Sequence, residues 1–377
     1  MKALCLQGGG AKGAYQAGVL KALTQKGCRF DCVVGTSVGS INAAMYALGK
    51  VDELYDLWKE LDFADVLPLE RKGEGQNLTF RSIAATAIEA FRSGVDTSKI
   101  RAIIEKHVNE DALRASPIRF GLVTAKGSFT KPVLCEMFIE DIPKGQLVDY
   151  IMASSALPFF KKVEIDGVRY LDGGILDNLP IRMLANAGYT DVTAVRLGGD
   201  LHYEDKEKGL KVTYIDPSES VGHTINFSNF SITHDLNLGY YDVLRLYDGL
   251  YGKKYYVKPF GKWSLRFWMW KHRRFVNAAV AQIGVKFCSS FREKAAVLSA
   301  FLADKLKCKE ASLVEIWTKF VEYVAGLGAL ERWRIYRFAE FAEVAAKREF
   351  DQKKQSGETE ELFALARLLK EEISNGK

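Results

Sequence analysis

Three glycine-rich sites in the first half of the chain contain residue types that could perform acyl-transfer chemistry. They are Gly8-Gly9-Gly10-Ala11-Lys12-Gly13, Gly35-Thr36-Ser37-Val38-Gly39 and Asp172-Gly173-Gly174. The first is a turn of bare backbone N–H groups ahead of a predicted helix, which can hold a developing oxyanion as readily as a phosphate. The second is a serine between glycines, the pattern of a nucleophile elbow that exposes the serine oxygen at a helix start.

Two phosphate-binding interpretations of the first site do not fit its neighbours. A dinucleotide fingerprint requires an acid at the end of the second strand. Here Asp31 lies at the start of that strand, and Gly35-Thr36-Ser37 stand at its end. A phosphate P-loop requires Lys-Ser or Lys-Thr after its last glycine, whereas Ala14-Tyr15 follow Gly13. We therefore interpret the first site as a loop whose backbone N–H groups donate hydrogen bonds to an oxyanion.

The other two sites each have a purely structural interpretation as well. Ser37 would cap the helix that follows it, and Asp172 would be a turn aspartate bonded to its own backbone. Both residues stand at the end of a predicted strand, and open α/β sheets place their sites at that edge. We therefore expect Ser37 and Asp172 to meet there.

The three sites in this order resemble the patatin-like phospholipase family. The stretches ASSALPFF at 153–160 and DNLP at 177–180 are also similar to that family, and the resemblance covers about residues 1–200. It implies a catalytic dyad, with Ser37 as the nucleophile and Asp172 as its general base. It also implies an oxyanion hole in the glycine loop at 8–13, a lipid ester as the substrate, and no metal or cofactor.

A Ser-His-Asp triad fits the sequence less well than a dyad. Four histidines follow Asp172, so chain order alone does not exclude a triad. However, an α/β-hydrolase would carry an HGGG-type oxyanion loop, and no histidine precedes Gly8. A carboxylate is a weak base for an alcohol. In a dyad, either burial raises the pKa of Asp172 or the oxyanion hole carries much of the barrier.

Hydrophobic periodicity predicts the elements that must position these residues. The chain opens with a βαβα pattern, which indicates a parallel sheet with helices packed on it. The predicted strands lie at 2–7, 31–35, 118–125, 131–138, 163–174 (a hairpin), 191–197 and 211–215, and the predicted helices at 12–26, 38–48, 51–62, 80–91 and 145–156. The helix at 80–91, behind a polar loop at 71–77, would be a lid, a wall for the acyl chain, or a helix packed on the sheet.

The expected architecture is a three-layer α/β/α patatin-like domain with a mostly parallel central sheet, followed by an α-helical C-terminal region. The predicted boundary separates residues 1–262 from residues 263–377, and no strand is expected beyond residue 263. A second hypothesis makes the protein a membrane-associated scaffold or regulator whose C-terminal helices carry the function. All three catalytic pieces are present, so we favour the enzyme, and acyl transfer to another acceptor would use the same residues.

Positive charge is concentrated in the segment 253–274. The whole chain has a formal charge of +6, this segment carries +8 with no acid, and the remaining residues sum to −2. If the segment is helical, Trp263, Phe267 and Trp270 share one face. They would contact anionic lipid or join a core. A single-stranded nucleic acid is not expected, because no recognised module accompanies the patch. The candidate membrane interface comprises Lys262, Trp263, Arg266, Phe267, Trp268, Trp270, Lys271, Arg273 and Arg274.

The composition is that of a globular protein, with 48% hydrophobic and 27% charged residues. The N-terminal apolar run is too short for a signal peptide, and no stretch of about 18 apolar residues predicts a spanning helix. The cysteines form no C-x-x-C pair, and no histidine lies near another His or Cys at a metal-ligand spacing. We expect a cytoplasmic protein, peripheral at the membrane if the basic segment binds lipid. The cysteines are Cys5, Cys28, Cys32, Cys135, Cys288 and Cys308.

Overall fold

A computed structural model describes most of the chain. The residues it does not describe are 62–95, 158–159, 200–208, 223–228, 286, 352, 354–359 and 376–377. The predicted loop at 71–77 and the predicted amphipathic helix at 80–91 lie outside the described residues. In the part that is described, no helix is both long and apolar enough to cross a membrane.

The first part of the chain is built on an eight-stranded, mostly parallel sheet, as predicted. The strands follow one another across the sheet in the order β5-β6-β3-β2-β1-β7-β8, and β4 also pairs with β3. Strands β3, β2, β1, β7 and β8 are parallel to one another. Strands β4, β5 and β6 pair antiparallel with their neighbours. The strands are β1 (Lys2–Leu6), β2 (Cys32–Thr36), β3 (Arg119–Ser128), β4 (Lys131–Phe138), β5 (Val163–Ile165), β6 (Val168–Asp172), β7 (Asp191–Val195) and β8 (Lys211–Ile215).

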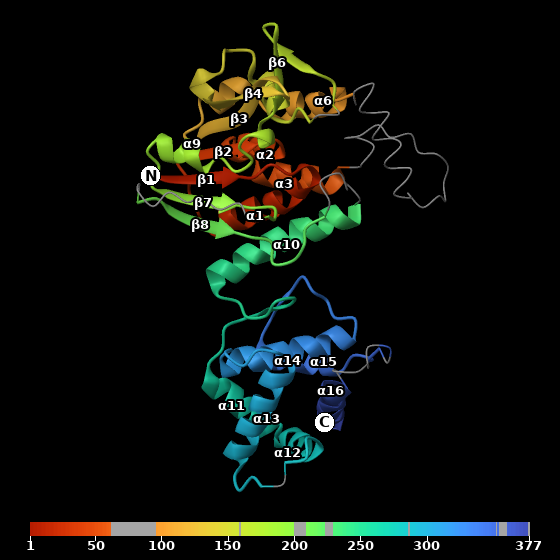
Figure 1. Ribbon diagram of the computed structural model, residues 1–377. Helices are drawn as coiled ribbons and strands as arrows, with labels where there is room; N and C mark the ends of the chain where they lie inside the picture. The colour runs from red at the N-terminus through yellow and green to blue at the C-terminus, as the bar shows by residue number, and fades with distance from the viewer. Residues whose placement is uncertain are drawn as a thin grey trace, which may run out of the picture. The chain divides into compact units, whose positions relative to one another are not determined.

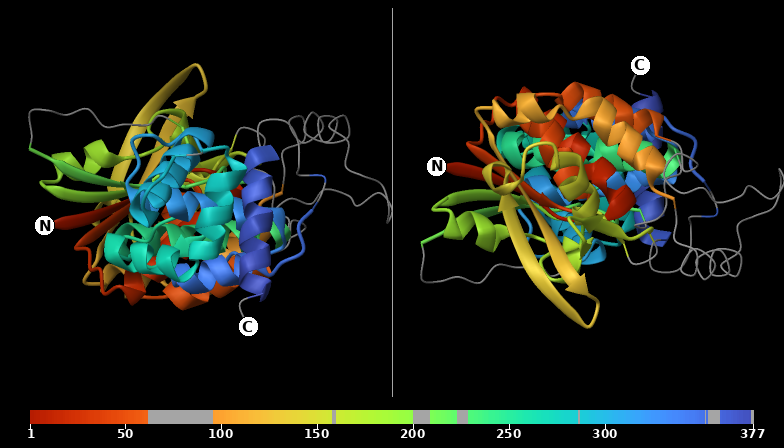
Figure 2. Two further views of the ribbon diagram at one scale, coloured as in Figure 1. Left: turned by 90° about the horizontal axis from the view of Figure 1, so that it is seen from below. Right: turned by 90° about the horizontal axis from the view of Figure 1, so that it is seen from above.

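Helices cover both faces of this sheet (Figures 1 and 2). Alternate residues of β1 point to opposite faces. Ala3 and Cys5 pack in one core cluster with Met183 of α9, whereas Leu4 and Leu6 are fully buried on the other face. The helices are α1 (Gly13–Gln25), α2 (Val38–Ala47), α3 (Val51–Glu60), α6 (Ser98–His107), α7 (Glu110–Arg114), α8 (Leu147–Ser154), α9 (Ile181–Asn186) and α10 (Asn229–Asp248), with short 3-10 turns η1 (Gly10–Lys12), η2 (Ile139–Asp141) and η3 (Gly173–Ile175).

The C-terminal part is helical and has its own core. The chain divides into two compact units, Met1–Val243 and Leu244–Lys377. The fully buried Trp317 and Phe320 belong to the core of the second unit. Its helices are α11 (Lys262–Lys271), α12 (Arg273–Gln282), α13 (Phe291–Lys305), α14 (Leu313–Leu327), α15 (Phe338–Ala346) and α16 (Glu360–Asn375). The predicted domain boundary between residues 262 and 263 stays a prediction.

One feature of this unit contradicts the expectation that strands end before residue 263. Strand β10 (Ile335–Tyr336) pairs parallel with β9 (Tyr256–Val257). A two-residue strand is too short to show any alternation of polar and apolar residues. Tyr336 and Val257 are almost completely buried, so tertiary packing holds this pair together.

Candidate functional site

Ser37 lies in the sharp turn between β2 and α2 with a strained backbone. Its φ is 55° and its ψ is −129°, a conformation that non-glycine residues rarely adopt. The side chain makes no capping hydrogen bond to α2, so the interpretation of Ser37 as a simple helix cap is wrong. A buried serine on such a turn has the backbone geometry of a nucleophile elbow.

The two glycines that flank Ser37 allow α2 to cross the ends of β1 and β2 very closely. A Cβ atom on Gly39 would lie 2.5 Å from the carbonyl oxygen of Leu6, and a Cβ on Gly35 would lie 2.2 Å from that of Gly39. Real Cβ atoms essentially never come this close to backbone. Both positions of the motif therefore require glycine for packing.

Ser154, at the end of α8, holds the nucleophile turn from the other side. The N–H of Ser37 donates to Ser154 Oγ at 2.9 Å, and the Ser154 hydroxyl donates to the carbonyl of Val123 at 2.7 Å. Ser154 belongs to the ASSALPFF stretch, which contributed to the family resemblance but was given no role. It is a positioning residue that the motifs did not identify.

Asp172 reaches Ser37 by a route that differs from the predicted one. We expected both residues at the carboxyl ends of parallel strands, but β6 runs antiparallel to β3. Strand β3 extends beyond β2, because Thr36, the last residue of β2, pairs with Val123 and β3 continues to Ser128. Strand β6 pairs with this extension and runs back along it, so that Asp172 ends opposite Thr124.

Asp172 combines a turn hydrogen bond with an unused carboxylate oxygen. Its Oδ1 accepts from the N–H of Gly174 at 2.7 Å, so the turn interpretation is correct for this oxygen. Its buried Oδ2 has no hydrogen-bond partner of standard geometry. Burial raises the pKa of Asp172 from 3.8 to about 6, against the nearby Ser37 hydroxyl and the Gly174 N–H, which lower it.

The glycine loop lies directly beside these two residues. A Cβ atom on Gly8 would lie 3.1 Å from Ser37 Cβ. The loop continues into η1, where Gly10 has a φ of 58°. The first N–H groups of a helical turn have no partner within that turn. The amides at Gly9, Gly10 and Ala11 are therefore the donors that this loop can offer to a ligand.

A buried chain of side-chain amides fixes the loop from behind. Gln16 Nε2 donates to the carbonyl of Gln7 at 2.6 Å, just before the loop. Asn42 Nδ2 donates to Gln16 Oε1 at 2.9 Å and to the carbonyl of Gly13, the last residue of the loop, at 3.0 Å. Trp58 Nε1 donates to Asn42 Oδ1 at 3.0 Å. Residues from α1, α2 and α3 thus hold both ends of the loop.

Asn178 joins the first and third motifs. Its side-chain Nδ2 donates to the carbonyl of Gly8 at 3.2 Å, and its backbone carbonyl accepts from the N–H of Gly8 at 3.1 Å. A Cβ on Gly174 would lie 2.7 Å from Asn178 Oδ1. Asn178 lies in the DNLP stretch, and its role also went unrecognised in the sequence.

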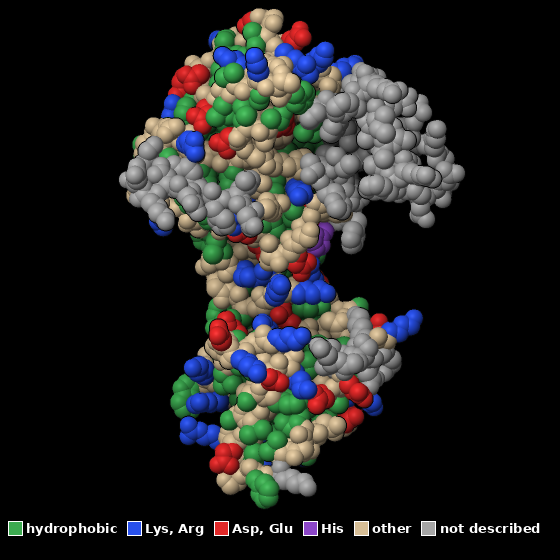
Figure 3. Space-filling model, viewed as in Figure 1, with side chains coloured by type: hydrophobic (Ala, Val, Ile, Leu, Met, Phe, Trp, Pro, Cys, Tyr) green, Lys and Arg blue, Asp and Glu red, His purple; other side chains and the backbone are tan. Residues whose placement is uncertain are grey.

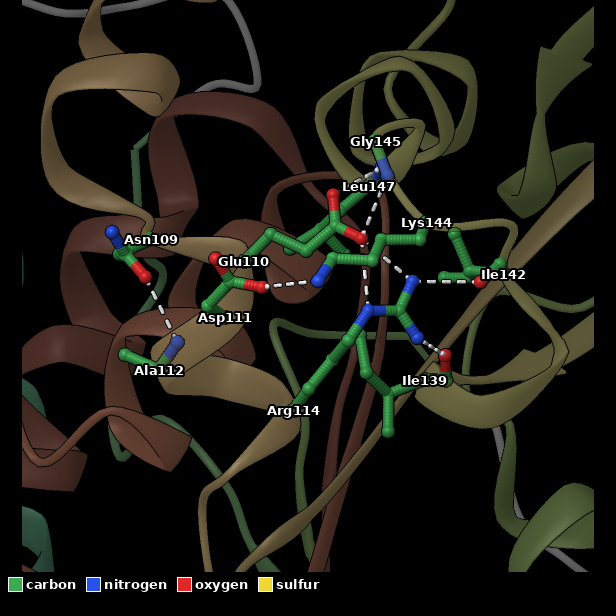
Figure 4. Close-up of polar contacts among 10 residues, drawn as sticks. All are labelled: Asn109, Glu110, Asp111, Ala112, Arg114, Ile139, Ile142, Lys144, Gly145 and Leu147. Atoms are coloured by element: carbon green, nitrogen blue, oxygen red, sulfur yellow. Dashed lines mark hydrogen bonds and ion pairs between the residues drawn. The ribbon is translucent and has the colours of Figure 1, made fainter.

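A second polar cluster anchors the start of α8, the helix that ends at Ser154 (Figure 4). Glu110 Oε1 accepts from Arg114 Nε at 2.8 Å and from the N–H of Gly145 at 3.0 Å. Glu110 Oε2 accepts from the N–H of Leu147 at 3.3 Å, and Arg114 also donates to the carbonyl of Ile142 at 2.7 Å. This cluster ties α7 to the first turn of α8.

The described histidines offer no alternative base for Ser37. His107 bonds to Glu53 at 2.5 Å and His234 to Asp235 at 3.0 Å. The ring of His272 packs against that of Trp268, with 4.6 Å between centroids, in the second unit. No histidine contributes to the pKa shift of Asp172. His202 and His223 lie outside the described residues. Within the described part, no three His, Cys, Asp or Glu side chains are grouped as metal ligands would be.

The candidate interface residues of α11 divide between surface and core. Trp263, Phe267 and Trp270 are exposed. Trp268 is buried, and its ring packs against Trp317 at 5.7 Å and Phe338 at 5.3 Å between centroids. Trp268 therefore belongs to the core and not to an interface, because it lies on the opposite side of the helix.

With this geometry in place, comparisons with known proteins define the class of the first unit. Residues 4–185 match the family model described as patatin-like phospholipase. The matched range contains all three glycine-rich motifs as well as Ser154 and Asn178. Residues 4–185 of this chain form a patatin-like phospholipase domain.

Relatives with similar sequences match over the same part of the chain. An uncharacterised NTE family protein of Mycobacterium tuberculosis is 30% identical over 198 residues, which are 52% of this chain and 49% of that protein. A cUMP-AMP-activated phospholipase of Escherichia coli is 28% identical over 234 residues, 54% of this chain and 66% of that protein. Lysophospholipase nte1 of Aspergillus terreus is 28% identical over 208 residues, 52% of this chain and 12% of that protein.

The chain spans about half the length of the mycobacterial relatives that it matches. Among solved structures, VipD from Legionella pneumophila matches 99% of this chain and 91% of its own, with 16% sequence identity and a TM-score of 0.42. At that score the likeness carries no conclusion about fold or function.

Proposed function

We propose that this protein is a serine acyl hydrolase that cleaves the carboxylic esters of lipids with a Ser37–Asp172 dyad. The main support is the pairing of a strained, buried serine with a buried aspartate whose Oδ2 has no hydrogen-bond partner of standard geometry. The relatives named phospholipase and lysophospholipase support lipid esters as the substrate class.

In the proposed reaction, Ser37 Oγ attacks the ester carbonyl carbon while its proton passes to Asp172 Oδ2. The negative charge that develops on the carbonyl oxygen is stabilised by the backbone amides around Gly9 and Gly10. Collapse of this intermediate breaks the ester bond, and the leaving alcohol takes the proton from Asp172. The acyl group then remains on Ser37 as an ester.

The second half of the reaction repeats the first with water as the nucleophile. Asp172 takes a proton from water, and the resulting oxygen attacks the acyl carbon held by Ser37. The same amides stabilise the second oxyanion, and Ser37 leaves with the proton from Asp172. The products are a free fatty acid and the unchanged enzyme.

The pKa of about 6 suits Asp172 to this role. A general base works best when its pKa lies near the operating pH, because it is then mostly ionised yet still basic. An exposed aspartate would be a far weaker base for an alcohol. Burial of Asp172 therefore supplies the pKa shift that the dyad requires.

The residues after the Asp-Gly-Gly motif support an apolar substrate. Ile175 and Leu176 are 40% and 44% exposed. They follow Asp172 by three and four residues, so exposed apolar side chains lie in the same short segment as the candidate base. An acyl chain is a ligand that such side chains would suit.

A phosphonate probe and a panel of esters test the proposal. The panel contains nitrophenyl esters, lysophospholipids and diacylphospholipids. Wild-type protein should react with the probe and hydrolyse lipid esters, and Ser37→Ala should do neither. Asp172→Asn should lose at least about a thousandfold in turnover, as removal of a catalytic base does. Exposed Ser128→Ala and Asp166→Asn serve as matched controls. Equal labelling of wild type and Ser37→Ala would contradict the proposal.

A further inference from the structure

We propose that the exposed face of α11 docks on an anionic lipid surface. On this helix Trp263 is 80% exposed, Phe267 64% and Trp270 55%. The opposite side carries Leu265 and Met269, which are almost completely buried in the core of the second unit. The helix is thus anchored by one face and presents three large aromatic rings on the other.

The geometry of the helix places basic side chains on both sides of this aromatic stripe. At about 100° per residue, Trp263, Phe267 and Trp270 fall within about 60° of one another around the helix axis. Arg266 then lies about 40° beyond one edge of the stripe, and Lys271 lies about 40° beyond the other.

The rings and the guanidinium groups form one continuous surface. The Phe267 and Trp270 rings stack with their centroids 6.0 Å apart. The guanidinium of Arg266 lies 5.4 Å from the centroid of the Trp263 ring, and that of Arg273 lies 5.4 Å from the centroid of the Trp270 ring. These contacts hold the charged groups at the same level as the rings.

The carboxylates that the structure describes compensate little of the positive charge of this surface. Of the carboxylates that the structure describes, none forms an ion pair with Lys262, Arg266, Arg273 or Arg274. The charge of Lys271 is partly offset by Glu343, with which it interacts electrostatically. Figure 3 shows hydrophobic and basic side chains interleaved over α11, at the left edge of the second unit in this view.

A lipid surface satisfies both halves of this pattern at once. Tryptophan prefers the headgroup level of a bilayer, and basic residues are attracted to anionic headgroups. A helix with one aromatic face bordered by Lys and Arg is typical of segments that lie in the membrane interface. A protein partner would need an apolar groove lined with acids on both sides. The proposal does not depend on the proposed hydrolase activity.

Vesicle co-sedimentation of the full chain tests the proposal. Ser37→Ala is the background, so that the vesicles stay intact if the protein is a hydrolase. We expect binding to phosphatidylcholine vesicles that contain about 30% phosphatidylserine, little binding to pure phosphatidylcholine, and weaker binding at high salt. Replacing Arg266 and Arg273 together by Gln should weaken binding by about twenty-fivefold, at about fivefold for each charge.

Aromatic variants and matched controls separate insertion from simple charge attraction. Trp263→Ala with Trp270→Ala should also weaken binding, without loss of fold, because both side chains are exposed. Lys319→Glu, an exposed charge reversal on α14, and Phe287→Ala, an exposed aromatic outside the basic segment, should bind as the background protein does.

Three outcomes would overturn the proposal. The first is binding that ignores the anionic lipid content, and the second is unchanged binding by the α11 variants. The third is concentration-dependent self-association that the Trp263→Ala, Trp270→Ala variant abolishes in analytical ultracentrifugation. That result would assign the surface to contacts between copies of this chain. Since the background protein already lacks Ser37, failure here leaves the hydrolase proposal untouched.

Discussion

At the scale of single residues, the site depends on the compromise made at Asp172. Its carboxylate is buried, which destabilises the charged form, and one hydrogen bond to Oδ1 compensates only in part. A better-satisfied aspartate would be more stable but less basic. Functional sites commonly keep such unfavourable groups at some cost to stability.

This compromise predicts how stability changes with pH. The pKa of Asp172 is higher in the folded state (about 6) than in the unfolded state (3.8), so its contribution to stability is present at low pH and lost as pH rises through 6. Asp172→Asn removes this loss. At pH 8 the variant should be more stable than wild type by up to about 3 kcal/mol, although it should be inactive.

Denaturant unfolding of both proteins at pH 4 and pH 8 measures this difference. Other groups titrate equally in the two proteins, so the comparison isolates Asp172. Asp166→Asn, in an exposed turn, should show no such pH-dependent difference. An advantage of Asp172→Asn that is as large at pH 4 as at pH 8 would exclude the proposed pKa.

At the scale of elements, the end of α8 supports the nucleophile turn through Ser154, and α7 anchors the start of α8. The anchor is the partly buried pair Glu110 and Arg114. Burial raises the pKa of Glu110, but hydrogen bonds from Gly145, Arg114 and Leu147 outweigh it and lower the pKa overall. The charged form of Glu110 is thus the one that this cluster stabilises.

Arg114→Ala should therefore destabilise the first unit by about 2 to 3 kcal/mol, because it leaves a partly buried carboxylate without its main partner. The neighbouring pair Asp111 and Lys144 provides a matched control, since both of its side chains are about three-quarters exposed. Asp111→Ala should cost at most about 0.5 kcal/mol. Thermal or urea unfolding compares the two variants, and equal effects would refute the argument.

At the scale of the whole molecule, the proposed catalytic machinery lies entirely in the first unit. Helix α10 belongs to it as far as Val243, and there α1 and α10 pack backbone against backbone. A Cβ atom on Gly18 would lie 2.0 Å from the carbonyl oxygen of Leu236, and a Cβ on Gly239 would lie 2.0 Å from that of Tyr15. A functional fragment must therefore include the whole of α10, which ends at Asp248.

We predict that a fragment of residues 1–248 folds and hydrolyses short-chain esters at close to the rate of the full chain. The physical reason is that this fragment contains the complete eight-stranded sheet and the whole of α10. It lacks α11, so it should lose binding to anionic vesicles. Circular dichroism checks folding, and a nitrophenyl ester assay checks activity. A folded but inactive fragment would show that the C-terminal helices take part in catalysis.

The sequence by itself determined the features that depend on local chemistry. Three features act within a few residues and can therefore be recognised from sequence motifs alone. They are the glycines beside Ser37, the Asp-Gly turn and the glycine loop. Long periodic segments were predicted for the same reason, and all eight strands of the sheet overlap segments predicted as strands. Helices α6, α7, α9 and α10 were not predicted. The two-residue strand β10 was missed because it has no local pattern.

Only the tertiary structure decided which distant residues meet. Ser154 holds the amide of Ser37 from 117 residues away, and Asn178 reaches Gly8 from 170 residues away. Asp172 reaches the site because β6 runs back along the overhang of β3, a pairing that no local motif encodes. Likewise, only packing separates the exposed Trp263 from the buried Trp268. Such contacts arise when elements pack together, and sequence spacing alone contains no record of that packing.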